Sequence, residues 1–130
     1  MKEKSCGAII VKDNEVLLIK SKNGIVNFPK GHVEKSETEV ETAIREVKEE
    51  TNLDIEIISK YRYENKYLME NGIDKEVIFF LAIPKSLDIV KQESEISEIF
   101  WCEIDNVASM LMYENQQILW SKAIKDIKSI

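Results

Sequence analysis

The sequence predicts an α/β or α+β domain in which helices cover a mixed β-sheet. Segments typical of strands alternate along the chain with segments typical of helices, which is the pattern of such layered folds. The 130 residues are 44% hydrophobic and 32% charged, as in ordinary globular proteins. This length suits one core, so we expect a single domain over residues 1–130.

The strands are predicted from apolar runs and from the turns between them. Residues 5–11 and 15–20 favour two strands joined by a turn at Asp13 and Asn14. Residues 54–67 alternate in polarity and favour one or two strands.

A second hairpin is predicted further along the chain. Asn71-Gly72 is its turn signal. Residues 75–83 are almost wholly apolar and favour a central strand that ends at Pro84, and residues 99–104 favour a short strand.

Three helices are predicted. Ser36 and Glu39 match a capping box at the start of the central helix. Asp105 is a plausible N-cap of a helix to Met112, and Asn115 begins a last helix to about Lys128. The expected inner face of the central helix is Val40, Ala43, Ile44 and Val47, and that of the last helix is Ile118, Leu119, Ala123, Ile124 and Ile127.

The central helix carries three crowded carboxylates. Glu46 and Glu50 are four residues apart, so they lie on one helix face, and Glu49 borders that face. Like charges at this spacing repel each other. A hard divalent cation such as Mg²⁺, which prefers oxygen ligands and is usually shared with substrate phosphates, would neutralise them. The alternative is a solvated acidic helix face without a ligand.

Charge, cysteine and histidine content argue against several classes of protein. The net charge of −6 argues against a dedicated nucleic-acid surface, which requires a basic patch. Cys6 and Cys102 lie in apolar segments, so we expect two reduced core thiols. His32 is the only histidine, too few for a histidine-based zinc site or a Ser-His-Asp triad. Because no apolar run has transmembrane length and no signal-peptide pattern is present, we expect a cytoplasmic protein without membrane contact.

The spacing around the central helix resembles the Nudix box. Gly31, five residues, Glu37, seven residues and the run from Arg45 to Glu50 follow this pattern, with the aliphatic Leu53 at its end. Asn52 is the one departure, because the family has glycine there. Asparagine tolerates a left-handed backbone better than other residues that carry a Cβ, so we expect Asn52 to form the same helix-ending turn.

The resemblance extends to the diadenosine tetraphosphate hydrolase branch of the Nudix family. It is carried by residues 28–34 before the box, residues 75–81 in the long strand, Glu95 ahead of Trp101, and residues 111–115. It implies an α/β/α sandwich with a mixed sheet flanked by helices.

The resemblance also implies roles for single residues. Metal ligation falls chiefly to Glu46, Glu49 and Glu50, with Glu95 nearby, and the general base is either a box glutamate or Glu95. Arg45 would orient a box carboxylate through a bidentate pair.

The substrate-binding residues implied in the same way are Lys30, Lys75 and Phe79. Lys30 and Lys75 would meet phosphate, and Phe79 would stack on adenine. Simpler interpretations stay open: an exposed loop lysine for Lys30, a buried strand aromatic for Phe79, and one more charge in the acidic loop 92–98 for Glu95.

The expected function is hydrolysis, dependent on Mg²⁺ or Mn²⁺, of a pyrophosphate bond in a nucleoside diphosphate linked to another group. Asymmetric cleavage of diadenosine tetraphosphate to ATP and AMP is the leading reaction. Hydrolysis of nucleoside triphosphates or of an RNA 5′ end is one alternative, and a non-catalytic nucleotide-sensing Nudix module is another. The intact set of Glu46, Glu49 and Glu50 argues against the sensor. We expect a nucleotide as partner and a monomer or homodimer.

Overall fold

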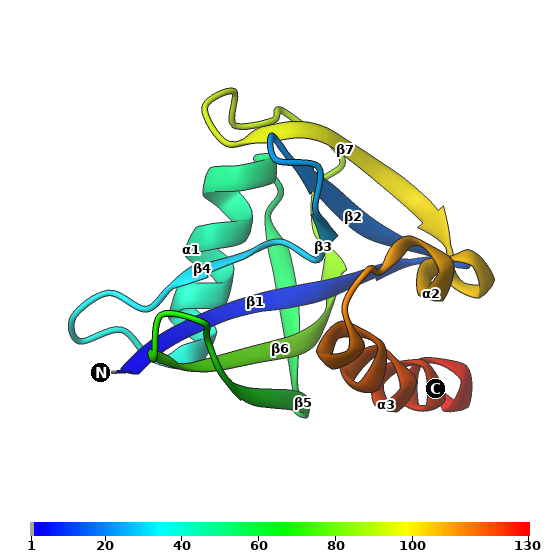
Figure 1. Cartoon of the computed structure of the whole chain (residues 1–130). Coiled ribbons are helices and arrows are strands. Elements are labelled where there is room, and N and C mark those ends of the chain that lie inside the picture. Colours follow the sequence, from blue (N-terminus) through cyan, green and yellow to red (C-terminus); the bar gives the residue numbers. More distant parts are fainter. Residues whose placement is uncertain (1) are drawn as a thin grey trace.

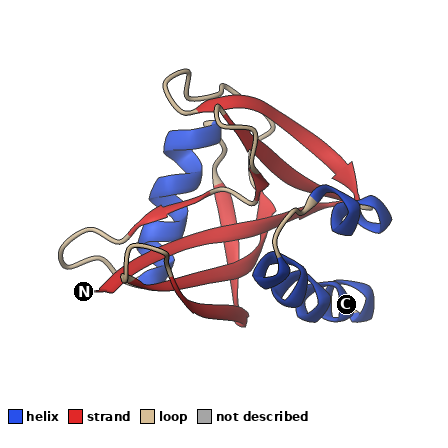
Figure 2. Ribbon diagram, in the orientation of Figure 1, coloured by secondary structure: helices blue, strands red, loops and turns tan. Residues whose placement is uncertain are grey.

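The computed structural model describes residues 2–130 and places a sheet between helices (Figure 1). Helix α1 packs on one face of the sheet, and α2 and α3 lie on the other (Figure 2). The strands are β1 (Lys2–Lys12), β2 (Glu15–Ser21), β3 (Val26–Asn27), β4 (Lys30–His32), β5 (Ile55–Leu68), β6 (Asp74–Pro84) and β7 (Ile96–Glu103). The helices are α1 (Glu39–Thr51), a 3-10 turn (Ile104–Asn106), α2 (Val107–Met110) and α3 (Glu114–Ser129).

The sheet is mixed, as predicted. Its strand order is β3-β2-β1-β6-β5, with β4 paired to β1 and β7 paired to β2. Strands β1 and β6 run parallel, from Lys2 opposite Asp74 to Ile10 opposite Ala82, and the other pairs are antiparallel. Strand β1 pairs first with β4 and then, further along, with β2. The sheet therefore divides beside β4, where the Nudix-like segment begins.

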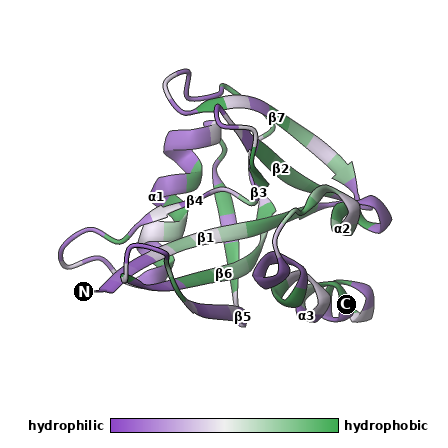
Figure 3. Ribbon diagram, viewed as in Figure 1, coloured by the Kyte–Doolittle hydropathy of each residue, from purple (hydrophilic) through white to green (hydrophobic). Residues whose placement is uncertain are grey.

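The two faces of the sheet form separate cores, because side chains alternate along a strand. The face under α3 buries Ile9, Val77, Phe79, Leu81, Leu119 and Trp120, among others. The face under α1 buries Ala8, Ile10, Leu17, Val47, Leu53 and Ala82. Strands β1, β2 and β6 are apolar over most of their length, whereas the outer side of α1 is hydrophilic (Figure 3).

Several predicted elements are confirmed. The turn at Asp13 and the hairpin turn at Gly72 both have positive φ angles, of 55° and 83°. Asn52 ends α1 in the left-handed conformation, with φ 69° and ψ 3°. Cys6 and Cys102 are buried free thiols.

Within residues 2–130, no helix is both long enough and apolar enough to span a membrane.

The predicted capping box is wrong by two residues. The N-cap of α1 is Thr38, whose hydroxyl accepts a hydrogen bond from the backbone N–H of Glu41 at 3.1 Å. The Glu41 carboxylate in turn accepts one from the Thr38 N–H at 2.9 Å. Ser36 lies outside the helix with φ 74°, so it belongs to the preceding loop.

Other corrections concern the helix faces and the short elements. Ile44 and Ile118 are 41% and 46% exposed, and Trp120 is buried instead. Asp105 lies inside the 3-10 turn, and α2 is only four residues long, with no side-chain cap. Strand β7 begins at Ile96, three residues earlier than predicted, because pairing with β2 extends it through polar residues.

Candidate active site

Arg45 makes hydrogen bonds to several carboxylates at the acidic end of α1. Its guanidinium holds Glu37 in a bidentate pair, with Nε–Oε2 and Nη2–Oε1 distances of 2.6 and 2.9 Å. Its Nη1 donates to Glu46 Oε1 at 2.8 Å and to Glu49 Oε1 at 3.0 Å, and Nη2 donates to the carbonyl of His32 at 2.9 Å. The hydrogen bonds from Arg45 lower the pKa of Glu37 to about 2. One side chain thus ties the loop, β4 and two helix carboxylates together.

Glu46 lies directly over Gly31 of β4. A methyl group at Gly31 would overlap the carboxylate of Glu46, so only glycine leaves this place free. Burial is the main cause of the raised pKa of Glu46, and the charges of Glu49 and Glu95 add to it. The contact between β4 and α1 therefore sets where this carboxylate can lie.

Glu50 is the most buried of the helix carboxylates, at 7% exposed. Its Oε1 accepts the backbone N–H of Lys30 at 3.0 Å. Burial, followed by the charge of Glu46, raises the pKa of Glu50 to about 8, and the charge of Glu95 also contributes. The charges of Glu46 and Glu95 therefore disfavour the ionised form of Glu50.

The chemistry of this donor set fits a divalent cation. Crowded carboxylate oxygens that raise one another's pKa are relieved by a hard ion such as Mg²⁺. As they stand among residues 2–130, no three acidic, His or Cys side chains are already gathered to hold a metal. Both carboxylate oxygens of Glu49 accept from Arg45 Nη1, at 3.0 and 3.2 Å. Ligation by Glu46, Glu49 and Glu50 stays a prediction.

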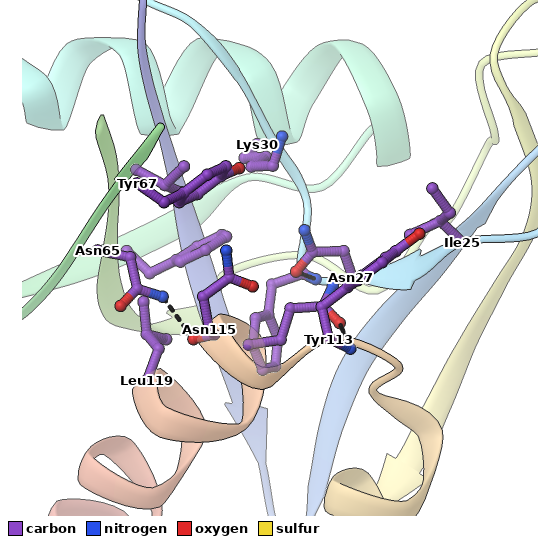
Figure 4. Close-up of a pocket in the computed structure, with 12 residues that line it drawn as sticks. Ile25, Asn27, Lys30, Asn65, Tyr67, Tyr113, Asn115 and Leu119 are labelled. Atoms are coloured by element: carbon purple, nitrogen blue, oxygen red, sulfur yellow. Dashed lines mark hydrogen bonds between the residues drawn. The ribbon is translucent and has the colours of Figure 1, made fainter. Parts of the chain in front are cut away.

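A cavity of about 320 Å³ opens beside this acidic site (Figure 4). Tyr67 stands on one side of it and Tyr113 on another, 38% and 48% exposed. The residues that line it are Ile25, Asn27, Phe28, Lys30, Asn65, Tyr67, Val77, Phe79, Tyr113, Asn115, Gln116 and Leu119. Sequence reasoning missed both tyrosines as candidates; Tyr67 shares a strand face with Asn65, a signal that could have found it.

The cavity is framed by hydrogen bonds to the start of α3. Asn65 Nδ2 donates to the carbonyl of Asn115 at 2.5 Å, which ties β5 to α3. Gln116 Nε2 donates to the carbonyl of Val26 at 3.0 Å, which ties α3 to β3. Three elements that are distant in sequence are thereby fixed around one space.

Phe79 is both a core residue and part of the cavity wall. It is 3% exposed and packs edge-on against Phe28, with ring centroids 5.3 Å apart at 73°. The interpretation of a buried strand aromatic is therefore confirmed. Its stacking on adenine stays a prediction.

Of the two candidate lysines, Lys30 lines this cavity, and Lys75 lies opposite the cavity residue Tyr67 in the pairing of β5 with β6. Lys30 is half-buried in β4 and lines it, so the interpretation as an exposed loop lysine is wrong. Burial, followed by the charge of Lys75, lowers the pKa of Lys30. Lys75 is 6% exposed, and its Nζ donates to Ser5 Oγ at 2.7 Å and lies 3.6 Å from Glu3. The charge of Lys75 therefore disfavours the charged form of Lys30, while Lys75 itself has partners in Ser5 and Glu3.

Comparison with known proteins identifies the family. The NUDIX domain matches residues 1–121. The chain is 32% identical to the asymmetrical bis(5'-nucleosyl)-tetraphosphatase of Sus scrofa over 130 residues, covering 88% of each chain. It is 33% identical to Nudix hydrolase 2 of Arabidopsis thaliana, covering 87% of this chain and 43% of that one.

Solved structures agree with this result. The binary complex of a C. elegans Ap4A hydrolase superposes with a TM-score of 0.88 at 26% identity, covering 98% of this chain and 99% of that one. A MutT NUDIX hydrolase from Burkholderia pseudomallei shares the fold, with a TM-score of 0.79 at 23% identity over 94% of this chain and 98% of that one. The chain therefore belongs to the NUDIX domain family and is a Nudix-type pyrophosphohydrolase.

Proposed function

We propose that this chain hydrolyses a pyrophosphate bond in a nucleoside diphosphate linked to another group, and that it cleaves diadenosine tetraphosphate asymmetrically to ATP and AMP. The observation that carries the proposal is the cavity with its two exposed tyrosines, which opens beside the crowded carboxylates of α1. A purine fits between aromatic walls, and its phosphate chain would then reach Glu46 and Glu50. The relatives named as asymmetrical tetraphosphatases support this choice of substrate.

The reaction requires neutralised phosphate oxygens and a deprotonated water. A Mg²⁺ or Mn²⁺ ion held by Glu46, Glu49 and Glu50 would supply charge neutralisation and a more acidic water. Arg45 holds the carboxylates of Glu46 and Glu49 in place through its hydrogen bonds. This fixed placement matters because small displacements of reacting groups cost large factors in rate.

The remaining side chains bind the substrate and move the proton. Lys30, on the cavity wall, and Lys75, which lies opposite Tyr67 in the strand pairing, would contact the phosphate chain. Either Glu95 or a box glutamate accepts the proton from water. Phe79 and the two tyrosines would hold the base.

The test is a substrate panel read by chromatography. Diadenosine tetraphosphate, ATP, an oxidised nucleoside triphosphate and a 5′-triphosphate RNA are each incubated with the protein, with Mg²⁺, with Mn²⁺ or with chelator. We expect ATP and AMP in equal amounts from diadenosine tetraphosphate, only with a divalent ion present. Two ADP molecules, or rapid triphosphate hydrolysis alone, would contradict the proposed substrate. Tight nucleotide binding without any product would favour the sensor alternative.

We further propose a cytoplasmic enzyme that acts as a monomer or homodimer. Buried free thiols at Cys6 and Cys102 suit a reducing compartment. Light scattering of the purified protein would measure the oligomeric state, and localisation of a tagged chain would test the compartment.

A further inference from the structure

The loop of residues 85–95, between β6 and β7, runs along the end of α1. The backbone N–H of Val90 donates to the carbonyl of Thr51 at 3.0 Å, and that of Gln92 donates to the carbonyl of Glu50 at 3.2 Å. These bonds use carbonyls that the helix leaves without partners in its last turn. The loop is therefore docked on the part of α1 that carries the candidate ligands.

Asn52 adds a side-chain bond to this contact. Its backbone ends the helix at φ 69°, with its N–H donating to the carbonyl of Lys48 at 3.0 Å. Its Nδ2 donates to the carbonyl of Asp88 at 2.9 Å. Glycine, which the Nudix box has at this position, adopts the same backbone but has no side-chain donor. The departure from the family pattern therefore supplies a hydrogen bond that glycine cannot make.

The docked loop has further anchors toward both of its ends. The N–H of Lys85 donates to the carbonyl of Asp54 at 2.7 Å, the N–H of Asp54 donates to Ser86 Oγ at 3.0 Å, and Lys91 Nζ donates to the carbonyl of Ser97 at 3.0 Å. Ile89 of the loop packs against the core under α1, whereas Leu87 and Val90 are each 62% exposed. The side-chain oxygen of Gln92 is buried without a partner among residues 2–130, which disfavours the docked position. Among the described residues, Asn52 supplies the side-chain donor that joins the end of α1 to this loop.

The loop delivers Glu95 to the acidic site. Ile96, the next residue, is 2% exposed and fixes the end of the loop in the core. The carbonyl of Glu95 accepts the backbone N–H of Lys22 at 3.0 Å. The carbonyl of Gln92, whose N–H is bonded to the Glu50 carbonyl, accepts the N–H of Ile96 at 3.0 Å, so the turn 92–96 that carries Glu95 starts at Glu50. The contribution of Glu95 to the raised pKa of Glu46 and Glu50 agrees with this placement. Where the loop lies thus decides where Glu95 lies.

We propose that Asn52 is a positioning residue whose amide clamps the loop 85–95 onto α1 and so holds Glu95 beside Glu46 and Glu50. The clamp follows from the hydrogen bonds alone. The consequence for turnover rests on the proposed function, in which Glu95 takes part in hydrolysis.

Hydrogen exchange of the free protein tests the clamp without any substrate. Asn52→Gly keeps the left-handed backbone and removes the donor, and Asn52→Asp tolerates the same backbone and also lacks the donor. We expect the amides of Val90 and Gln92 to exchange about fivefold faster in both variants, the factor that one net hydrogen bond is worth. Amides in the middle of β6 should be unchanged.

The matched control is Asn14→Gly, in the turn after β1. Asn14 is exposed, and its side chain makes no hydrogen bond to the described residues. This variant removes an asparagine side chain and adds the same backbone freedom, so it should leave the exchange of Val90 and Gln92 unaltered. Unchanged exchange of these two amides in Asn52→Gly would overturn the clamp.

A double-mutant cycle tests the effect on turnover. We expect Asn52→Gly to lower kcat about tenfold or more at nearly constant KM, because the loop contacts the acidic site and not the cavity. If Asn52 acts through Glu95, adding Asn52→Gly to Glu95→Gln should lower kcat no further.

Three kinetic outcomes would overturn this part of the proposal. They are an equal loss of kcat in both backgrounds, a change in KM alone, and full activity of Glu95→Gln. If none of the panel substrates is hydrolysed, the proposed function fails, while the exchange measurement still decides whether Asn52 clamps the loop.

Discussion

A methyl group on Gly31 should abolish most of the activity while leaving the fold intact. The added Cβ would overlap the carboxylate of Glu46. That carboxylate is the far end of a flexible side chain, so it can move aside without moving the backbone. Gly31 has no positive φ, so alanine at this position brings no backbone strain.

The expected change in stability is small because two effects oppose each other. Losing the contact between Glu46 and Arg45, whose side chains are 15% and 23% exposed, costs about 1 kcal/mol. Replacing glycine by alanine stabilises by about 0.5–1 kcal/mol, since the unfolded chain loses freedom. We therefore expect Gly31→Ala to change the free energy of unfolding by less than about 1 kcal/mol. Moving the carboxylate by about 1 Å should lower kcat about 100-fold.

Gly7→Ala is the matched control in the neighbouring strand. Gly7 lies opposite Lys30 in the pairing of β1 with β4, and its added Cβ would overlap the carbonyl of Pro29 and the Cα and Cβ of Lys30. The backbone must move to make room, and this strains the bond from the Ala8 N–H to the Pro29 carbonyl. We therefore expect Gly7→Ala to lower the free energy of unfolding by about 3 kcal/mol. Thermal melts and turnover on the substrate that the panel identifies measure both variants. Wild-type turnover in a folded Gly31→Ala variant would refute the reasoning that Glu46 must occupy this place.

Three further predictions rest on single residues. The hydrogen bond from Arg62 is the main cause of the lowered pKa of Glu39, about 2 against 4.5. Because the folded-state pKa is depressed, Glu39 stabilises the fold above pH 4.5, and this contribution is lost as the pH falls toward 2. The free energy of unfolding of the wild type should exceed that of Glu39→Gln by about 1–2 kcal/mol at pH 7, a figure reduced because Glu39 is partly exposed. The two proteins should become equally stable in melts at pH 2. Phe79→Ala should lower the free energy of unfolding by about 3 kcal/mol or more in denaturant titrations, since the ring is buried. Tyr113→Ala should instead raise KM at nearly constant stability, and the reverse pattern would contradict this division. Glu49→Gln should keep its melting temperature and lose turnover by orders of magnitude, and unchanged kinetics would remove it from the proposed metal site.

Local features were predictable from the sequence because their causes are local. The strands of the first hairpin and the central strand follow from apolar runs of strand length. The shared helix face of Glu46 and Glu50 follows from their spacing alone. The left-handed turn at Asn52 follows from the backbone preference of asparagine after a helix.

Where two local solutions compete, the sequence did not decide between them. Ser36 with Glu39 and Thr38 with Glu41 both fit a capping box, and the structure uses the second pair. Ser36 instead lies in the loop with a positive φ. The next residue, Glu37, pairs with Arg45 of the helix. The helix start was therefore set by a contact between a loop and a helix, which propensity does not encode.

By itself, the sequence determined the mixed-sheet class, the acidic helix face and the residues of the family motif. Only the tertiary structure decided which groups meet at the site. Three such meetings join residues that are far apart in the chain. Glu46 lies over Gly31, the N–H of Lys30 donates to Glu50, and Tyr67 lies across the cavity from Tyr113. The physical reason is that strand register and helix packing place these groups. Both are set by burial of the whole core, so no local pattern carries that information.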